Sequence, residues 1–345
     1  MTTTAVQKKV IILCGGQSSE HEISCISAGG VLKEIDRTLF DPVVIGITKS
    51  GEWVLPLPDQ MLEIHNGVLP EIKSGTPIGI SELIEKYAPD VIFPLLHGPY
   101  GEDGTIQGLL EMAGVRYVGS GVLASAVAMD KSFAKPIFAA HGLKVAPGIV
   151  IHQRDWRGAI DTGDLSFPLF VKPARGGSSR GTTKVKSAEN LAAAIDEALT
   201  FDTKVMVEEA IVGREIECAV LQIDGVAHAS PLGEISLDPR FEFYDFEAKY
   251  LDGSTKVISP TDLPTDLIRS AAVTAFNALG CEGLARVDFF FSGAGELIIN
   301  EINTMPGFTS TSVFPKLWSE AGRNYQTLIT NLLESALSRS ASVIR

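Results

Sequence analysis

Three short apolar runs in the N-terminal part of the chain constrain the fold more than any other feature of the sequence. They cover residues 10–13, 43–47 and 91–95, and glycine, proline or polar residues end them. Runs of this length and composition are typical of strands buried on both faces of a parallel sheet. With helical segments between them, they predict an open α/β sheet.

The length of the chain predicts more than one hydrophobic core. Single cores stop growing at roughly 250–300 residues, and this chain has 345. Apolar residues make up 45% of it, but no apolar run approaches the roughly 20 residues of a membrane-spanning helix. We therefore expect two or three lobes and no membrane association.

Charge and cysteine content narrow the class of protein further. A formal net charge of −13, without a cluster of lysine and arginine, argues against nucleic acid as a partner. The cysteines show neither C-x-x-C spacing nor pairing with histidine, which indicates neither a zinc site nor a disulfide framework. Reduced thiols fit a cytoplasmic protein best. These cysteines are Cys14, Cys25, Cys218 and Cys281.

The middle of the chain predicts a second, smaller α+β lobe. Helical spacing covers residues 129–142. Strands are expected at 170–172, 183–186 and 205–209, around a helix at 188–199.

A third lobe is expected to open with an alternating strand at 214–222. The strand turns at Asp224-Gly225, a dipeptide suited to a tight hairpin because both positions tolerate positive φ. After an irregular segment at 236–260, Thr265 is expected to cap a helix that Gly280 ends. Two strands and a C-terminal helix complete the chain. The apolar positions of the predicted helix are Ile268, Ala272, Ala275, Phe276 and Leu279.

The two late strands, 284–291 and 296–303, predict an antiparallel hairpin with a four-residue loop. That register places Arg286 opposite Glu301, with Asp288 and Asn303 on the same face. Oxygen ligands of this kind are those that magnesium prefers, and an arginine beside them suits phosphoryl transfer. The alternative is a cross-strand ion pair on a solvated face, with no ligand.

A glycine-rich segment at 171–181 leaves a predicted strand, so its amide groups can approach phosphate oxygens. It does not match G-x-x-x-x-G-K-[ST], and no G-x-G-x-x-G follows the first strand, which argues against a dinucleotide enzyme. A plain connector is the alternative explanation for such a segment.

Together these motifs resemble the ATP-grasp D-alanine:D-alanine ligase family, and the resemblance extends over all three predicted lobes. The order and spacing of five blocks make coincidence a poor explanation. The blocks are GGQSSEHEIS at 15–24, HGPYGEDG at 97–104, MDK at 129–131 with VKPARGGSSRG at 171–181, YDFEAKY at 244–250, and RVD at 286–288 with NEINTMPG at 300–307.

The resemblance implies an ATP-grasp fold of the α/β and α+β classes. Residues 1–121 would form an N-terminal open parallel α/β lobe and residues 122–211 a small central α+β lobe. Residues 212–345 would form a C-terminal lobe with an antiparallel sheet, which carries the metal and catalytic site.

The resemblance also implies that ATP is held between the central and C-terminal lobes. Lys131, Lys172 and Lys249 would meet its phosphates, although exposed lysines are often only solvated. Two Mg²⁺ ions, or Mn²⁺ in their place, would be held by Asp288, Glu301 and Asn303. The adenosine pocket would be formed by Phe170, Glu208, Glu209, Ile211, Glu215 and Phe290.

For the amino-acid substrates, the resemblance implies that Glu20 receives the ammonium of the first D-alanine. A carboxylate at a helix N-terminus also has a purely structural explanation, since it favours the helix dipole. Ser178 and Tyr250 resemble the pair that joins Glu20 to close two loops over the substrate. His97 would contact substrate as well.

The second substrate and the reacting centre are implied in the same way. Ser312 would bind the carboxylate region of the second D-alanine. Arg286 and the Gly307 amide would stabilise the tetrahedral oxyanion.

The implied activity is ATP-dependent ligation of two D-alanines to D-alanyl-D-alanine through D-alanyl phosphate, with ADP and phosphate as products, for peptidoglycan precursor synthesis. A ligase for D-alanine and D-lactate is one alternative, and Tyr250 argues against it because phenylalanine accompanies the hydroxy acid in this family. A degenerate nucleotide-binding ATP-grasp protein is another, and the complete set of metal ligands argues against it. Family habit predicts a homodimer through the first lobe.

Overall fold

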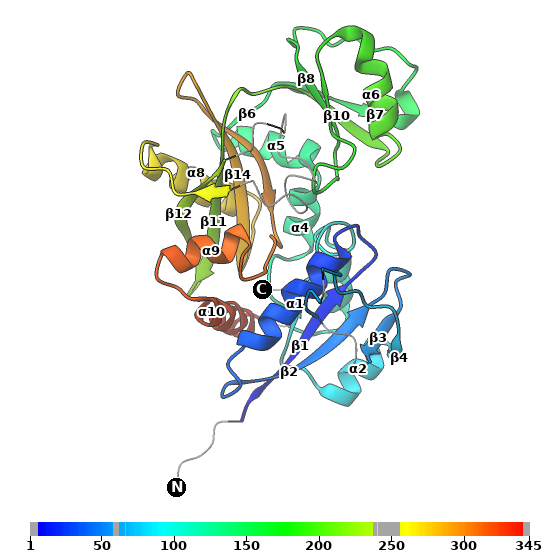
Figure 1. Ribbon diagram of the computed structural model, residues 1–345, viewed down its shortest axis with the longest axis vertical. Coiled ribbons are helices and arrows are strands. Elements are labelled where there is room, and N and C mark those ends of the chain that lie inside the picture. The colour runs from blue at the N-terminus through cyan, green and yellow to red at the C-terminus, as the bar shows by residue number, and fades with distance from the viewer. Residues whose placement is uncertain (1–5, 58–61, 66, 237–239, 241–255, 341–345) are drawn as a thin grey trace.

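The computed structural model describes residues 6–57, 62–65, 67–236, 240 and 256–340. They form three sheets with helices around them (Figure 1). The first sheet has the order β4-β3-β2-β1-β5. Its strands are β1 (Lys8–Gly15), β2 (Phe40–Ile47), β3 (Trp53–Pro56), β4 (Gly75–Pro77) and β5 (Val91–Pro94).

The predicted strands of the first sheet are confirmed, and they pair in parallel. β1 lies between β2 and β5 and is parallel to both. Val10, Ile12 and Leu13 are fully buried, as expected of a strand that is covered on both faces. The sequence analysis did not predict β3 and β4, which extend the sheet beyond β2 through antiparallel pairing. The helices of this region are α1 (His21–Glu34), α2 (Ile80–Tyr87) and α3 (Thr105–Met112).

The second sheet is small and antiparallel, with the order β7-β10-β8-β9. The helix α6 (Leu191–Ala198) packs against it, and together they enclose a separate core around Val171, Ile195 and Val207. In Figure 1 this lobe lies at the top, away from the first sheet. Its strands are β7 (Gly148–His152), β8 (Leu169–Pro173), β9 (Thr183–Val185) and β10 (Lys204–Glu209).

The third sheet has the order β13-β12-β11-β14-β15-β6. The predicted tight turn joins β11 to β12, with Asp224 at φ 50° and Gly225 at φ 78°. The strands are β11 (Gly213–Ile223), β12 (Val226–Ser236), β13 (Lys256–Ile258), β14 (Leu284–Ser292), β15 (Leu297–Asn303) and β6 (Lys144–Val145). The short β6 comes from the segment before the second sheet and pairs in parallel with β15.

The helix α8 (Thr265–Ala278) covers one face of the third sheet, and the five apolar residues predicted for it are buried. Thr265 is its first residue rather than its cap. Its hydroxyl donates to the Leu263 carbonyl at 3.3 Å, and Pro264 occupies the capping position. The helices α4 (Val122–Met129) and α5 (Lys131–Ala140) share the core beneath α8.

The C-terminal region contains two helices, α9 (Val313–Glu320) and α10 (Tyr325–Ser338), where one was predicted. They pack between the first and third sheets. A continuous core there joins Phe93 of β5 to Leu221 of β11 and Leu332 of α10. The first and third sheets are therefore parts of one packed unit. No helix in the described ranges has the length and apolar character needed to cross a membrane.

The register of the β14–β15 hairpin differs from the prediction by two positions. The Ser292 amide donates to the Glu296 carbonyl at 2.9 Å, so the turn encloses three residues rather than four. An irregularity at Asn300 then adds one residue to β15. As a result Arg286 lies opposite Asn303, not Glu301, and Glu301 lies opposite Asp288.

The buried face of α8 gives a direct test of the packing. Phe276 is 0% exposed and Leu267, on the same helix, is 56% exposed. We expect Phe276→Ala to lower the free energy of unfolding by about 3–5 kcal/mol, because it leaves a cavity. Leu267→Ala should change it by about 0.5 kcal/mol or less. Chemical denaturation followed by circular dichroism measures both, and equal effects would contradict the assignment of this face to the core.

Candidate functional site

Two cavities meet at the centre of the molecule. The first lies between the second and third sheets. The second lies between the first lobe and the third sheet. Ser178, Glu217 and Glu301 line both cavities. The two cavities therefore meet at these residues.

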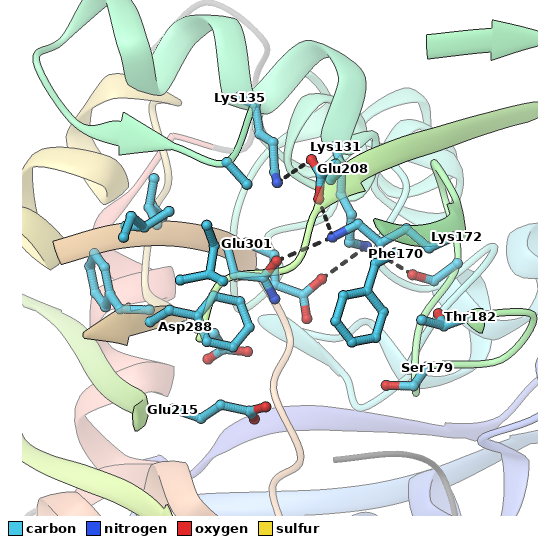
Figure 2. Close-up of a pocket in the computed structure, with 18 of the residues that line it drawn as sticks. Lys131, Lys135, Phe170, Lys172, Ser179, Thr182, Glu208, Glu215, Asp288 and Glu301 are labelled. Atoms are coloured by element: carbon cyan, nitrogen blue, oxygen red, sulfur yellow. Dashed lines mark hydrogen bonds and ion pairs between the residues drawn. The ribbon is translucent and has the colours of Figure 1, made fainter. Parts of the chain in front are cut away.

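The first cavity brings together the residues that the sequence analysis assigned to ATP. Its walls combine aromatic and aliphatic side chains with lysines and carboxylates, as small-molecule sites commonly do (Figure 2). The predicted residues that line it are Lys131, Phe170, Lys172, Glu208, Glu209, Ile211, Glu215 and Phe290. Lys249 lies outside the described residues.

A buried ionic network forms one wall of the first cavity. The Glu208 carboxylate on β10 pairs with the Lys172 Nζ at 2.7 Å and with the Lys135 Nζ. Lys172 also donates to the Asn300 Oδ1 at 3.2 Å, which links β8 to β15. Figure 2 shows Lys135 reaching Glu208 from α5. The network therefore connects β8, α5 and β15 to the Glu208 carboxylate.

Opposed charges shift the pKa values in this network. Burial works to raise the pKa of Glu208, but the ammonium groups of Lys172 and Lys135 lower it to about 2. Burial lowers the pKa of Lys135 to about 8, and the positive charge of Lys172 acts in the same direction. Lys135 therefore changes charge closer to neutral pH than an ordinary lysine does.

Lys131 sits at the first turn of α5 and faces the junction of the cavities. Its Nζ donates to the Gly176 carbonyl at 2.9 Å and pairs with the Glu301 Oε2 at 2.9 Å. Burial works to lower the pKa of Lys131, but the Glu301 carboxylate outweighs it and the pKa is raised. Lys131 is thus held between the glycine-rich loop and β15.

The predicted metal ligands share one face of the β14–β15 hairpin, despite the changed register. The Arg286 Nε and Nη2 each donate to Asp288 at 2.7 Å, and the Asn303 Nδ2 donates to Asp288 at 3.0 Å. Cross-strand pairing places Glu301 beside Asp288. The convergence of two carboxylates, an amide and an arginine is therefore present.

The donor set fits Mg²⁺ better than a softer metal. Asp288, Glu301 and Asn303 offer only oxygen ligands, which suits an ion that also takes waters and phosphate oxygens. The described part of the chain contains no group of three His, Cys, Asp or Glu residues arranged to hold a metal by themselves. A metal here would therefore depend on the Asn303 amide and on ligands from a substrate.

The second cavity brings together the residues assigned to the amino-acid substrates. The Ser178 hydroxyl donates to the Glu20 Oε1 at 2.7 Å, which joins the glycine-rich loop to the start of α1. Ser178 adopts a φ of 51°, in the left-handed region. Tyr250 lies outside the described residues, so its predicted place beside this pair stays a prediction. The predicted residues that line the cavity are Glu20, His97, Ser178, Arg286, Gly307 and Ser312, with Glu301 and Asn303.

His97 and Ser312 are held by neighbouring polar groups. The His97 Nδ1 lies 2.9 Å from the Met305 carbonyl, and the Nε2 lies 3.3 Å from the Ser27 hydroxyl. Burial lowers the pKa of His97, which favours the neutral ring. The Ser312 hydroxyl accepts from the Thr309 amide at 3.1 Å.

Three residues that line the cavities were missed in the sequence analysis: Lys135 and Glu217, which are buried, and Glu102, which is half-buried. Lys135 lies four residues after Lys131 on the same helix face, a spacing that could have revealed it. Glu217 lies two residues after Glu215 on β11, and alternation could have placed both on one face. Glu102 accepts from the Gly98 and Met305 amides, and burial raises its pKa to about 8. Glu102 lies within the HGPYGEDG block, but the sequence analysis assigned it no role.

Comparison with known proteins gives matches over nearly the whole chain. A family model described as "D-ala D-ala ligase N-terminus" matches residues 9–120, and one described as "D-ala D-ala ligase C-terminus" matches residues 137–334. The chain is 47% identical to the D-alanine–D-alanine ligase of Paenarthrobacter aurescens (strain TC1), over 99% of this chain and 98% of that protein.

Solved structures agree with these matches. The VanG D-Ala:D-Ser ligase from Enterococcus faecalis superposes with a TM-score of 0.78 at 35% identity, over 96% of this chain and 100% of that chain. The D-alanine–D-alanine ligase from Bacillus anthracis, in complex with ATP, superposes with a TM-score of 0.74 at 28% identity, over 96% and 97% of the two chains.

Proposed function

The chain belongs to the D-alanine–D-alanine ligase family and has its ATP-grasp fold, so it is an ATP-dependent ligase that joins two D-alanines in peptidoglycan synthesis, and we propose that its two cavities divide this reaction between them. ATP binds in the first cavity and the D-alanines bind in the second. The observation that carries the proposal is the junction itself. There the lysine-lined cavity meets the Glu20–Ser178 pair across Glu301.

In the first cavity, we assign the ATP phosphates to Lys131, Lys172 and Lys249. Support comes from the position of Lys131 and Lys172 on one wall and from the ATP complex of the Bacillus anthracis relative. The remaining predicted residues would surround adenosine, with Phe170, Ile211 and Phe290 as its apolar walls. Lys135, which was not predicted, is a second partner of Glu208, so the carboxylate stays neutralised when Lys172 also donates to the nucleotide.

Asp288, Glu301 and Asn303 would hold two Mg²⁺ ions, or Mn²⁺ in their place. When bound, these ions supply positive charge that neutralises the ATP phosphates during transfer. The chain carries a net charge of −13, so it must provide such charge locally.

In the second cavity, Glu20 receives the ammonium of the first D-alanine. This contact directs the carboxylate of the D-alanine toward the junction. That carboxylate oxygen attacks the γ-phosphorus of ATP, ADP leaves, and D-alanyl phosphate forms. A carboxylate must be activated in this way because oxide is a poor leaving group. Ser178 holds Glu20 in place, and together with Tyr250 it would keep water from the acyl phosphate.

The amine of the second D-alanine, held near Ser312, then attacks the carbonyl carbon of D-alanyl phosphate. Arg286 and the Gly307 amide stabilise the oxyanion, and His97 contacts the substrate. Phosphate leaves as the carbonyl reforms, which gives D-alanyl-D-alanine. Interactions that are stronger in the transition state than in the ground state accelerate this step.

We also propose the three divisions 1–121, 122–211 and 212–345, a cytoplasmic location and a homodimer formed through the first lobe. The location follows from the need for ATP and from four free cysteines, all of them buried. The dimer rests on the resemblance to the family alone.

One assay tests the function directly. Phosphate and product are measured with ATP, magnesium and D-alanine, and then with L-alanine, D-serine or D-lactate as the second substrate. We expect one dipeptide for each phosphate with D-alanine and much less product with the others. A preference for D-lactate would identify a depsipeptide ligase. Nucleotide binding without phosphate release would identify a degenerate ATP-grasp protein.

Lys135→Met should raise the KM for ATP by roughly tenfold or more, since a bond to a charged group contributes about 1.5–3 kcal/mol. In the wild type the KM for ATP should rise as the pH passes about 8, because Lys135 then loses the charge that favours an anionic ligand. Lys135→Met should lose this pH dependence and Lys135→Arg should hold the KM low at higher pH. Lys144→Met serves as the control, since that lysine is 62% exposed. If the KM for ATP of Lys135→Met stays near the wild-type value, Lys135 does not contribute to ATP binding.

Glu301→Gln should abolish phosphate release while the protein stays folded, because it removes charge from the metal ligands at constant volume. Binding of Mn²⁺, followed by electron paramagnetic resonance, should weaken in parallel. Glu296→Gln, at the exposed end of the same hairpin, is the matched control. Turnover within about tenfold of wild type, or roughly 1.4 kcal/mol of transition-state stabilisation, would exclude Glu301 as a ligand.

A further inference from the structure

Glu217 is a carboxylate at the junction of the two cavities to which the reaction described above gives no role. Its side chain is only 7% exposed, and it lines both cavities. We propose that Glu217 is a positioning residue that holds the Arg286 guanidinium in place for the second, ligating step. This inference rests on the proposed function of Arg286.

Strand register places Glu217 in a row of acidic residues. Glu217 on β11 pairs with Asp288 on β14, and Asp288 pairs with Glu301 on β15. Cross-strand partners project from the same face of a sheet. The three carboxylates therefore lie side by side on three neighbouring strands. Glu217 is at one end of this row and is not one of the proposed metal ligands.

Arg286 is the cation that connects this row to the substrate cavity. Its Nε lies 2.7 Å from the Asp288 Oδ1 and 3.3 Å from the Glu217 Oε2, so both carboxylates share one edge of the guanidinium. Its Nη2 donates to Asp288 as well, at 2.7 Å. The Nη1 takes no part in these contacts, and Arg286 lines the second cavity. A guanidinium held along its Nε edge can therefore direct its far end toward a substrate.

The two carboxylates that share Arg286 have different duties in the proposed reaction. Asp288 is an expected metal ligand, and a cation bound there competes with Arg286 for the same oxygens. Glu217 is not an expected metal ligand, so it can stay paired with the Arg286 Nε when a metal ion occupies Asp288. A long arginine side chain that lost its anchor would spread over several rotamers and stabilise an oxyanion less well.

Glu217 as a metal ligand in its own right is the main alternative. The observed ion pair of the Glu217 Oε2 with the Arg286 Nε, at 3.3 Å, favours the role beside the arginine.

The test uses the full chain and the isosteric substitution Glu217→Gln. We expect kcat to fall by roughly 10- to 100-fold, because a displaced oxyanion donor acts only weakly. Affinity for a phosphinate mimic of the tetrahedral intermediate, measured by calorimetry with ADP and magnesium, should fall by a similar factor. Affinity for ATP without D-alanine should stay within about twofold, since Arg286 acts at the later step.

Glu234→Gln is the matched control. Glu234 lies on the same sheet and also pairs with an arginine, at 2.8 Å and 2.6 Å from Arg214, but it is not among the described residues that line either cavity. It should change kcat by less than about twofold. Glu217→Asp keeps the charge but shortens the side chain. It should lower kcat and the affinity for the phosphinate by smaller factors than Glu217→Gln does. It decides the question if Glu217→Gln fails to fold.

Several outcomes would overturn the inference. These are a folded Glu217 variant with kcat and phosphinate affinity near wild type, a loss confined to ATP affinity, or an equal loss in Glu234→Gln. A loss of Mn²⁺ binding in Glu217→Gln would instead make Glu217 a metal ligand and also overturn it. Failure of the wild type to make dipeptide would overturn the proposed function, whereas the results above concern Glu217 alone.

Discussion

The first cavity depends on the buried carboxylate of Glu208. Its side chain is 4% exposed, and an unpaired charge at such a site is strongly disfavoured. Lys172 and Lys135 must therefore stay with it. Lys172 also bonds to Asn300 of the third sheet, and α5 shares the core of that sheet. One carboxylate thus joins both walls of the cavity, and its position fixes the lysines that an anionic ligand would meet.

The same principle extends from Glu208 to the junction. Lys131 of α5 faces Glu301 of β15, and Arg286 faces Asp288 two residues further along β14, so each of these carboxylates has a cation beside it. These cations have partners before a ligand arrives. A strongly acidic protein can therefore present individual lysines to phosphates, although its overall charge is −13.

The sequence predicted the elements better than their register. The strands of the first sheet and the turn at Asp224-Gly225 were clear, because local composition determines them. The β14–β15 pairing was wrong because a shorter turn and an irregularity at Asn300 each shift it by one residue. Side chains alternate between the two faces of a strand, so a register shift of two residues leaves Asp288 and Asn303 on the same face. Lys135 and Glu217 were missed because their partners are distant in sequence.

The three lobes are not joined with equal strength, and this bears on how the site can open. The first and third sheets share a continuous apolar core, whereas the second sheet packs around its own. The glycine-rich loop of the second sheet meets the first lobe through the 2.7 Å bond between Ser178 and Glu20. A hydrogen bond to a charged group contributes about 1.5–3 kcal/mol. A contact of this strength is small beside a shared apolar core, so the second sheet can separate from the first lobe more easily than the third sheet can.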